Sequence, residues 1–278
     1  MKKISRRSFL AAAGLSVAAL ALTACGGSAS SVASSVASSA SSAAASTSAA
    51  AGELTTVEAG KLTMATNAAF PPYEMTTDAG DFEGIDIETA QAIADKLGLE
   101  LQIDDMDFDA ALLSVQQGKA DIVMAGVTVT DERKAVMDFS DSYATGIQSI
   151  IVPEGSDIAS PDDLADKKIG TQRGTTGYIY CSDDFGDENV VAYDDGLTAV
   201  QALNNGQVDA VVIDNAPAQE FVAANPGLKI LDTSYAEEDY AIGMAKNSPL
   251  EDAVNSALEE LKADGTLQAI VDKYITAE

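Results

Sequence analysis

The sequence contains no histidine, and this single absence excludes several kinds of site. Ser-His-Asp and Cys-His catalysis both need an imidazole as the base, and histidine-ligated metal centres need it as a ligand. The chain also lacks the Gly-x-x-x-x-Gly-Lys loop and the Gly-x-Gly-x-x-Gly turn, so nothing in it signals the familiar nucleotide sites. We therefore expect neither a bound metal nor a cofactor.

Cysteine is scarce as well, with only Cys25 and Cys181 in 278 residues. Two cysteines cannot form a disulfide framework, and Cys25 lies in a segment where, as argued below, it is expected to be modified. Cys181 follows an aromatic and apolar stretch of a helix candidate, Tyr178-Ile179-Tyr180. This position favours a small buried hydrophobe over a reactive thiol.

Basic residues are few, with 16 lysines and arginines against 44 aspartates and glutamates and a net charge of -28. Such a surface repels nucleic acid and offers no basic patch to anionic lipid, so we expect no nucleic-acid partner. It would also repel an anionic ligand unless a local cation were waiting for it. A basic side chain in a candidate site is therefore a strong indication that the site binds an anionic group.

The N-terminus has the pattern of an export signal. Basic residues that include Arg6 and Arg7 precede an apolar run over residues 9–24, which is shorter than the roughly 20 residues that span a membrane. The sequence Leu22-Thr23-Ala24-Cys25 resembles a bacterial lipobox, which would make 1–24 a signal peptide and Cys25 the lipidated first residue of the mature protein. An ordinary signal peptide with an incidental cysteine is the alternative, and a twin-arginine route is as compatible with residues 5–10 as the general one.

Residues 25–52 are expected to form a flexible tether behind the lipid. Residues 28–51 are almost wholly serine and alanine, with two valines, and small side chains bury too little apolar surface to offset the entropy of ordering. The rest of the chain, about 220 residues, suffices for one large α/β unit or for two lobes of about 100 residues each.

The most informative stretch in this remainder is the turn over residues 125–133, which follows a strand candidate at 120–124. Its glycine, the hydroxyls of Thr128 and Thr130, and Arg133 would come together at the carboxyl end of a strand, where open α/β sheets hold ligands. The planar fork of arginine binds a carboxylate through two parallel hydrogen bonds. Alternatively, Thr130 caps a short charged helix and Arg133 lies in solvent.

Alternating strand and helix patterns fill the first half of the folded region. They predict strands at 61–66, 100–103 and 120–124 with helices at 85–98 and 108–117, a βαβαβ order that implies a mostly parallel sheet. Between the first strand and the first helix, Pro71 and Pro72 force the chain out of the sheet. We expect this loop to present Phe70 as a ligand wall and to bury Tyr73 in the core.

Residues 61–276 resemble the polar amino-acid-binding proteins of bacterial ABC importers, solute-binding protein family 3, which includes glutamine-, histidine- and cystine-binding members. The matching segments occur in family order at 66–74, 84–97, 106–108, 125–134, 138–141, 174–177 and 213–217. The resemblance implies an α/β fold like that of type II periplasmic binding proteins, a clamshell of two lobes with mostly parallel sheets flanked by helices.

The resemblance also implies how the chain is divided. Residues 53–145 and 244–278 would form lobe 1, and residues 146–243 would form lobe 2. Two extended segments, 143–152 and 240–245, flank an inner βα pattern and would cross between the lobes as a two-strand hinge. Within lobe 2 the pattern predicts strands at 168–172, 189–193, 210–213 and 228–231 with helices at 175–182, 197–205 and 215–224.

The family pattern assigns roles to the two poles of an amino acid. Arg133 would pair with the α-carboxylate, assisted by Thr128 and by Thr175 or Thr176. Asp214 would take the α-ammonium group together with the backbone carbonyl of Gly126. The alternative for Asp214, which directly precedes a helix candidate, is a plain helix cap.

Four further positions match places where the family holds the ligand side chain. Phe70 and Phe108 would sandwich it between the lobes, although Phe108 as an ordinary core residue is an alternative. Asn67 and Gln172 would contribute amides, which favour a neutral polar side chain such as that of glutamine.

By resemblance, then, this is a non-enzymatic binding protein, a monomer anchored to the extracytoplasmic face of a bacterial membrane. It would deliver an amino acid to the permease subunits of an ABC transporter. Two alternatives stay open: an enzyme similar to cyclohexadienyl dehydratase, with Glu74 as the acid in the pocket loop, and a ligand-binding sensor subunit that signals through a partner protein.

Overall fold

The computed structural model of the 278-residue chain describes residues 54–275, all of which belong to one compact unit. The expected signal peptide (1–24), the lipidation site Cys25 and the tether (25–52) therefore lie outside the described residues. Within 54–275, no helix combines the length and the apolar character needed to cross a membrane.

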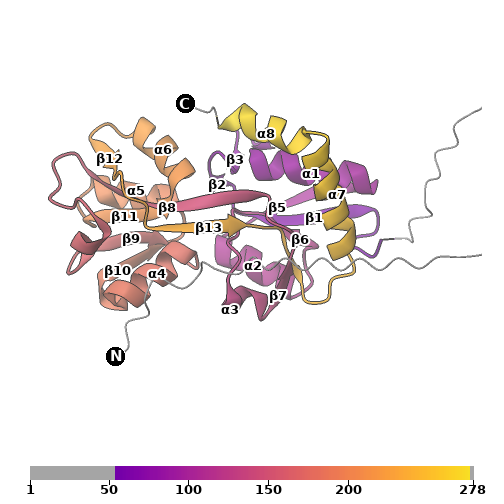
Figure 1. The fold of residues 1–278 in the computed structure, drawn as a ribbon, viewed down its shortest axis with the longest axis horizontal. Helices are drawn as coiled ribbons and strands as arrows, with labels where there is room; N and C mark the ends of the chain where they lie inside the picture. The colour runs from indigo at the N-terminus through magenta and orange to yellow at the C-terminus, as the bar shows by residue number, and fades with distance from the viewer. Residues whose placement is uncertain (1–53, 276–278) are drawn as a thin grey trace, which may run out of the picture. The chain divides into compact units, whose positions relative to one another are not determined.

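The first sheet has five strands in the order β5-β1-β6-β14-β7 (Figure 1). Strand β1 pairs in parallel with β5 and β6, whereas β14 pairs antiparallel with β6 and β7. The bounds are β1 (Lys61–Thr66), β5 (Glu100–Asp105), β6 (Ile122–Val123), β7 (Met137–Phe139) and β14 (Gly243–Ala245). With the helices that pack on it, this sheet is called the first lobe below.

Helices from both ends of the folded region cover the first sheet. They are α1 (Ile85–Leu97), α2 (Phe108–Gln116), α7 (Glu251–Ala263) and α8 (Thr266–Tyr274), with the short α3 (Asp131–Lys134) beside β7. Figure 1 shows α7 and α8, in yellow, next to the indigo and purple elements from the start of the fold. A small antiparallel sheet of β2 (Ala69–Phe70), β3 (Glu74–Thr76) and β4 (Phe82–Glu83) leads into α1.

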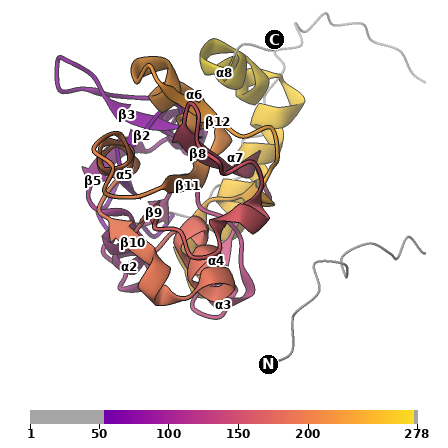
Figure 2. The ribbon, with the colours of Figure 1, turned by 90° about the vertical axis from the view of Figure 1, so that its left-hand side faces the viewer.

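The second sheet has the order β10-β9-β11-β8-β12, with β13 paired to β8, and its elements face the viewer in Figure 2. Its strands are β8 (Ala144–Pro153), β9 (Ile169–Gln172), β10 (Val190–Tyr193), β11 (Ala210–Asp214), β12 (Leu228–Ile230) and β13 (Ala236–Tyr240). Helices α4 (Thr176–Phe185), α5 (Gly196–Asn204) and α6 (Asn215–Ala224) pack on it, and η1 (Pro161–Leu164) and η2 (Asp187–Asn189) are short 3₁₀ turns. These elements form the second lobe.

The two-lobed α/β clamshell expected from the sequence is confirmed, but both sheets are mixed rather than mostly parallel. The parallel pairs are confined to the three strands in each sheet that helical crossovers connect. Strands β8 and β14 run against their neighbours and form the antiparallel pairs. Strand β12 follows β11 through helix α6, but its neighbour in the sheet is β8, so it also pairs antiparallel.

Strands β8 and β13 carry the chain between the two sheets. They lie side by side and pair antiparallel from Ala144↔Tyr240 to Gln148↔Ala236 (Figure 1). The second crossing, expected at 240–245, instead begins at Ala236 and continues into β14. The sequence pattern missed this start because Glu237, Glu238 and Asp239 interrupt any apolar alternation, and pairing with β8 holds the segment extended.

Each lobe has its own core. In the first, apolar side chains of α1 pack on those of α7 and α8 and on the sheet, and Tyr73 is buried among them as expected. Helix α1 ends at Gly98, whose left-handed conformation (φ 70°) suits glycine and closes the last turn through its N–H group. In the second lobe, Cys181 is a buried free thiol in the core, which confirms its expected role as a small hydrophobe.

Candidate functional site

A pocket lies between the two sheets and encloses about 440 Å³ of space, part of it open to solvent. Much of its lining comes from residues at or just beyond the carboxyl ends of β1, β6, β9 and β11, where α/β sheets hold ligands.

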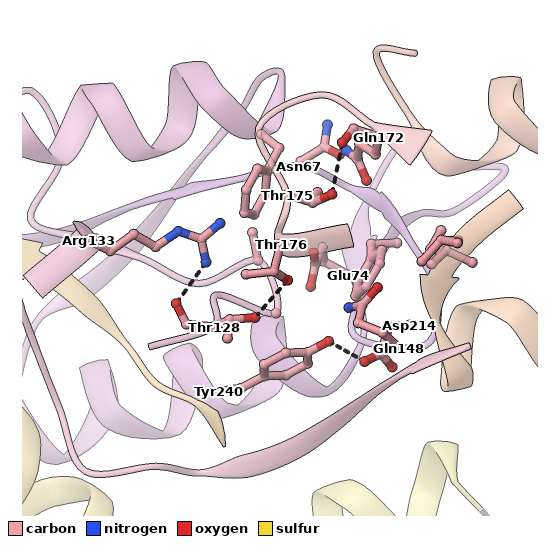
Figure 3. Close-up of a pocket in the computed structure, with 16 residues that line it drawn as sticks. Asn67, Glu74, Thr128, Arg133, Gln148, Gln172, Thr175, Thr176, Asp214 and Tyr240 are labelled. Carbon is pink, nitrogen blue, oxygen red and sulfur yellow. Dashed lines mark hydrogen bonds between the residues drawn. The ribbon is translucent and has the colours of Figure 1, made fainter. Parts of the chain in front are cut away.

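All ten residues expected to bind ligand line this one pocket (Figure 3): Asn67, Phe70, Phe108, Gly126, Thr128, Arg133, Gln172, Thr175, Thr176 and Asp214. Thr130, which was considered with Arg133, does not. Six further residues complete the lining: Glu74, Ala125, Gln148, Val212, Ile213 and Tyr240. The sequence therefore located the pocket, and the contacts below describe how its side chains are held.

Arg133 is buried, with only 8% of its surface exposed, although it belongs to a four-residue helix. Thr130 does cap this helix, since its hydroxyl accepts the backbone N–H of Arg133 at 3.1 Å, but the guanidinium does not lie in solvent. One of its nitrogens donates to the carbonyl oxygen of Thr128 at 2.7 Å, and another donates to that of Gly174, in the second lobe, at 3.2 Å. The Cζ atom of the Arg133 guanidinium lies 5.4 Å from the ring centre of Phe108.

Burial lowers the pKa of Arg133, and the nearby charge of Glu238 opposes that shift. A guanidinium has five N–H donors, and the two carbonyl contacts use only part of them. Within the described residues, no carboxylate forms an ion pair with Arg133. The side chain is thus a buried, orientated cation with donors left for an anionic group.

Asp214 ends β11 and is almost fully buried on the other side of the pocket. One carboxylate oxygen accepts the backbone N–H of Ala216 at 3.2 Å and so caps α6, while the other accepts the hydroxyl of Tyr240 at 2.5 Å. Asp214 therefore caps helix α6 and lines the pocket at the same time. Burial raises the pKa of Asp214 to about 6, although the bonds from Tyr240 and Ala216 oppose the shift.

The two amides bond to each other. The amide nitrogen of Gln172 donates to the amide oxygen of Asn67 at 2.8 Å, and the nitrogen of Asn67 donates to the carbonyl of Met106 at 2.9 Å. This link joins the two lobes. It also leaves these amides fewer free groups with which to read a neutral ligand side chain, the role expected for them.

Thr175 and Thr176, at the start of α4, have different contacts. The hydroxyl of Thr175 accepts the backbone N–H of Tyr178 at 3.3 Å and donates to the carbonyl of Gln172 at 2.8 Å, so it serves as the helix cap. Thr176 is the next residue in the helix, and its hydroxyl oxygen lies 3.4 Å from the hydroxyl oxygen of Thr128 in the first lobe. Of the two, Thr176 is the one in contact with the other lobe.

Glu74 is the most unusual lining residue. It has no exposed surface, and no N–H or hydroxyl group of the described residues donates to either carboxyl oxygen. Burial and then the charge of Asp86 raise its pKa well above the ordinary value. Asp86, which accepts the backbone N–H of Gly126 at 3.0 Å, has its own pKa raised to about 6 by burial. The two carboxyl groups interact, because a side-chain hydrogen bond between them also raises the pKa of Glu74 and opposes the rise in the pKa of Asp86.

Sequence reasoning missed the contribution of the crossing strands. Glu238 is 6% exposed and lies behind the pocket lining, where it bonds to Thr128, Thr176 and Gln148. Tyr240, two residues further along β13, bonds to Asp214. Residues at i and i+2 share one face of a strand, but Ala-Glu-Glu-Asp-Tyr shows no apolar alternation, so the sequence carries no local signal that places Glu238 and Tyr240 beside the pocket.

Within residues 54–275, no three side chains of cysteine, aspartate or glutamate gather closely enough to hold a metal ion. The polar groups that line the pocket are one guanidinium, the two carboxyl groups of Glu74 and Asp214, hydroxyls and amides. Such a set binds a small dipolar molecule by complementary charge.

Two lobes joined by paired crossing strands, with a polar pocket between them, define the class of type II periplasmic binding proteins. The comparison of sequences agrees: residues 62–277 match the bacterial extracellular solute-binding proteins, family 3, and the chain belongs to this family.

Individual relatives cover almost all of the folded region. The chain is 32% identical over 275 residues to a probable histidine-binding protein of Neisseria gonorrhoeae, covering 96% of this chain and 95% of the relative. A solved structure of the arginine-, lysine-, histidine-binding protein ArtJ from Geobacillus stearothermophilus has 34% identity and a TM-score of 0.75, over 78% of this chain and 96% of that one. An ancestral arginine-binding protein bound to glutamine has 42% identity and a TM-score of 0.75, over 78% and 99%.

The Glu74 carboxyl group predicts a pH dependence of stability in the protein without ligand. Its folded-state pKa is raised, so the folded chain binds more protons than the unfolded one, and stability falls as pH rises from the ordinary value towards the raised one. Glu74→Gln removes this loss, and its unfolding free energy at pH 8 should exceed that of the original by on the order of 1 to 3 kcal/mol.

Urea unfolding of both proteins at pH 5 and pH 8 measures the effect. Glu83→Gln, an exposed change on the neighbouring β4, is the control and should leave the pH dependence as it was. A Glu74→Gln protein whose stability falls with pH as steeply as the original would contradict the assignment.

Proposed function

We propose that this protein is the substrate-binding component of an ABC importer for a polar amino acid. The observation that carries the proposal is the placement of Arg133 on the first lobe and Asp214 on the second, both buried and both lining one pocket. The guanidinium would pair with the α-carboxylate, and the carboxylate of Asp214, with the carbonyl of Gly126, would take the α-ammonium group. Phe70 and Phe108 would flank the side chain.

Only a ligand with both charges can bridge the two lobes, and this explains how binding would signal to a permease. A zwitterion contacts both lobes at once only when they are closed, so it shifts the population towards the closed form. A permease that recognises the closed form then receives a loaded protein.

For the ligand side chain we propose a cationic group, with L-arginine as the first candidate. Glu74 lines the pocket, and no N–H or hydroxyl group of the described residues donates to its carboxyl oxygens, so a guanidinium or ammonium group would supply the missing donors. Relatives named for arginine, lysine and histidine support this choice. A neutral side chain such as that of glutamine, favoured by the amides of Asn67 and Gln172, is the second candidate, and an arginine-binding relative has been solved with glutamine.

The remaining expectations from the sequence are part of the same proposal. Residues 1–24 would be removed on export, and Cys25 would carry lipid that anchors a monomer to the extracytoplasmic face of the membrane through the 25–52 tether. Lobe 1 would comprise 53–145 and 244–278, and lobe 2 would comprise 146–243. We propose no catalytic activity, because every family relative described above is named for binding.

The lipid anchor can be tested separately from ligand binding. Cys25→Ser removes the thiol that lipidation requires, so the variant should be recovered in the medium or periplasmic fraction, whereas the original should remain with the membrane. Fractionation followed by immunoblotting measures this. Membrane association of the Cys25→Ser protein equal to that of the original would exclude the anchor.

Removing the guanidinium should weaken binding strongly. Arg133→Ala leaves the α-carboxylate of L-arginine desolvated and unpaired, at a cost of roughly 2 to 5 kcal/mol. At about 1.4 kcal/mol per tenfold, the dissociation constant should rise on the order of 30-fold to several thousand-fold. Arg173→Ala is a matched control, because Arg173 is half exposed and pairs with Asp194 outside the pocket lining. Titration calorimetry showing equal affinity for Arg133→Ala and the control would remove Arg133 from the site.

The charge of the ligand side chain should determine how many protons the protein releases on binding. A cationic side chain beside Glu74 lowers the raised pKa of this carboxyl group, so binding of L-arginine should release protons and tighten as pH rises from 5 to 8. L-Glutamine should release fewer. Calorimetry in two buffers of different ionisation enthalpy counts the protons. Tight binding of L-arginine with no proton release would show that its side chain does not meet Glu74.

A further inference from the structure

Glu238 occupies a central position that the proposed ligand contacts do not use. One of its carboxylate oxygens accepts three hydrogen bonds: from the hydroxyl of Thr128 at 3.0 Å, from the hydroxyl of Thr176 at 2.9 Å and from the amide nitrogen of Gln148 at 3.0 Å. These donors come from the first lobe, the second lobe and the crossing strand β8. All three line the pocket, whereas Glu238 lies behind them.

The direction of these bonds matters because a hydroxyl has a single hydrogen. An ionised carboxylate can only accept, so Thr128 and Thr176 must donate their hydrogens to Glu238. Neither hydroxyl can then donate to the other, although their oxygens are 3.4 Å apart. Each hydroxyl can then only accept hydrogen bonds from groups in the pocket, through the lone pairs of its oxygen.

This arrangement conflicts with the simplest view of the carboxylate site. An α-carboxylate also accepts only, so it cannot bond to a hydroxyl whose hydrogen is already committed. The donors left for it are N–H groups, those of the Arg133 guanidinium and of the backbone at the start of α4.

We propose that Glu238 is a specificity-determining positioning residue, which turns the hydroxyl hydrogens of Thr128 and Thr176 away from the pocket. The threonines then present acceptors to the ligand, and the α-carboxylate is held by N–H groups alone. This inference rests on the proposed function, since it concerns how the same pocket reads the α-carboxylate of an amino acid.

The setting of Glu238 fits such a role. It sits on β13 opposite Gly146 of β8, and the paired strands fix its backbone relative to Gln148. Its second carboxylate oxygen is buried and has no partner among the described residues. The strand ladder therefore orientates this carboxylate, and one of its oxygens serves the three lining side chains, while an interaction with Glu238 also raises the pKa of Tyr180.

The test compares two probes, L-arginine and L-argininamide, in which a carboxamide with N–H donors replaces the α-carboxylate. In the Glu238→Gln variant the new amide can donate to one threonine, whose hydrogen becomes free to turn towards the ligand, and a negative charge behind the site is removed. Both changes favour the acid. The ratio of the dissociation constant of the amide to that of the acid should rise on the order of tenfold relative to the original protein.

Each other outcome overturns the inference. If Glu238 is merely structural, Glu238→Gln weakens both probes equally and the ratio does not move. If the hydroxyls donate to the carboxylate in the original protein, the ratio falls. Glu237→Gln is the control, because Glu237 is the exposed neighbour on the same strand and should leave the ratio at its original value.

A ligand-free measurement separates this inference from the proposed function. Failure of the original protein to bind either probe would count against the proposed ligand, and Glu238 is then judged by thermal unfolding of Glu238→Leu, Thr176→Val and the double variant. Removing Glu238 leaves the buried hydroxyl of Thr176 without its acceptor, and this cost is absent when Thr176 is already valine. The costs at Thr128 and Gln148 are common to Glu238→Leu and to the double variant. The double variant should lose less melting temperature than the sum of the two single variants, and strictly additive losses would overturn the assignment.

Discussion

The buried guanidinium of Arg133 is the group on which the arrangement of the pocket depends. It donates to one carbonyl in each lobe, at Thr128 and at Gly174, and stacks near the ring of Phe108. A buried cation is costly unless hydrogen bonds and an anion compensate it. The carbonyls fix its direction without neutralising it, so the pocket retains an orientated positive charge in a protein whose net charge is -28. That contrast is what would let so acidic a protein hold a carboxylate.

The carboxyl groups around it complete the electrostatic description. Asp214 lies on the second lobe, Glu74 on the first, and Glu238 on the crossing strand, and all three are buried. Burial raises the pKa of Asp214 and Glu74, so a cation nearby would stabilise the ionised form of each carboxyl group. One zwitterion offsets Arg133 and Asp214 and leaves Glu74 without a cation beside it. The pocket lining has two carboxyl groups and one guanidinium, and this is the basis for the proposal of a ligand with a second positive charge.

The crossing strand β13 supports both poles of the proposed ligand. Glu238 orients the threonines near Arg133, and Tyr240, on the same face of the strand, holds Asp214 with a bond of 2.5 Å. The strand that joins the lobes is thus also the strand that sets the hydrogen-bonding direction of the site. Any change in its pairing with β8 would alter hinge and pocket together.

The sequence by itself determined the family, the two-lobed α/β architecture and ten of the residues that line the pocket. Among these, Arg133 lies in the turn region after β6 and Asp214 is the last residue of β11, and the apolar pattern of each strand marks its carboxyl end. Helix α6 was predicted to the residue, since its cap and first-turn proline are local signals. Only the tertiary structure decided that the amides of Asn67 and Gln172 bond to each other and that Glu238 receives three hydrogen bonds. Those partners lie up to 110 residues apart, and no local pattern of side chains encodes which distant donor a buried acceptor will meet.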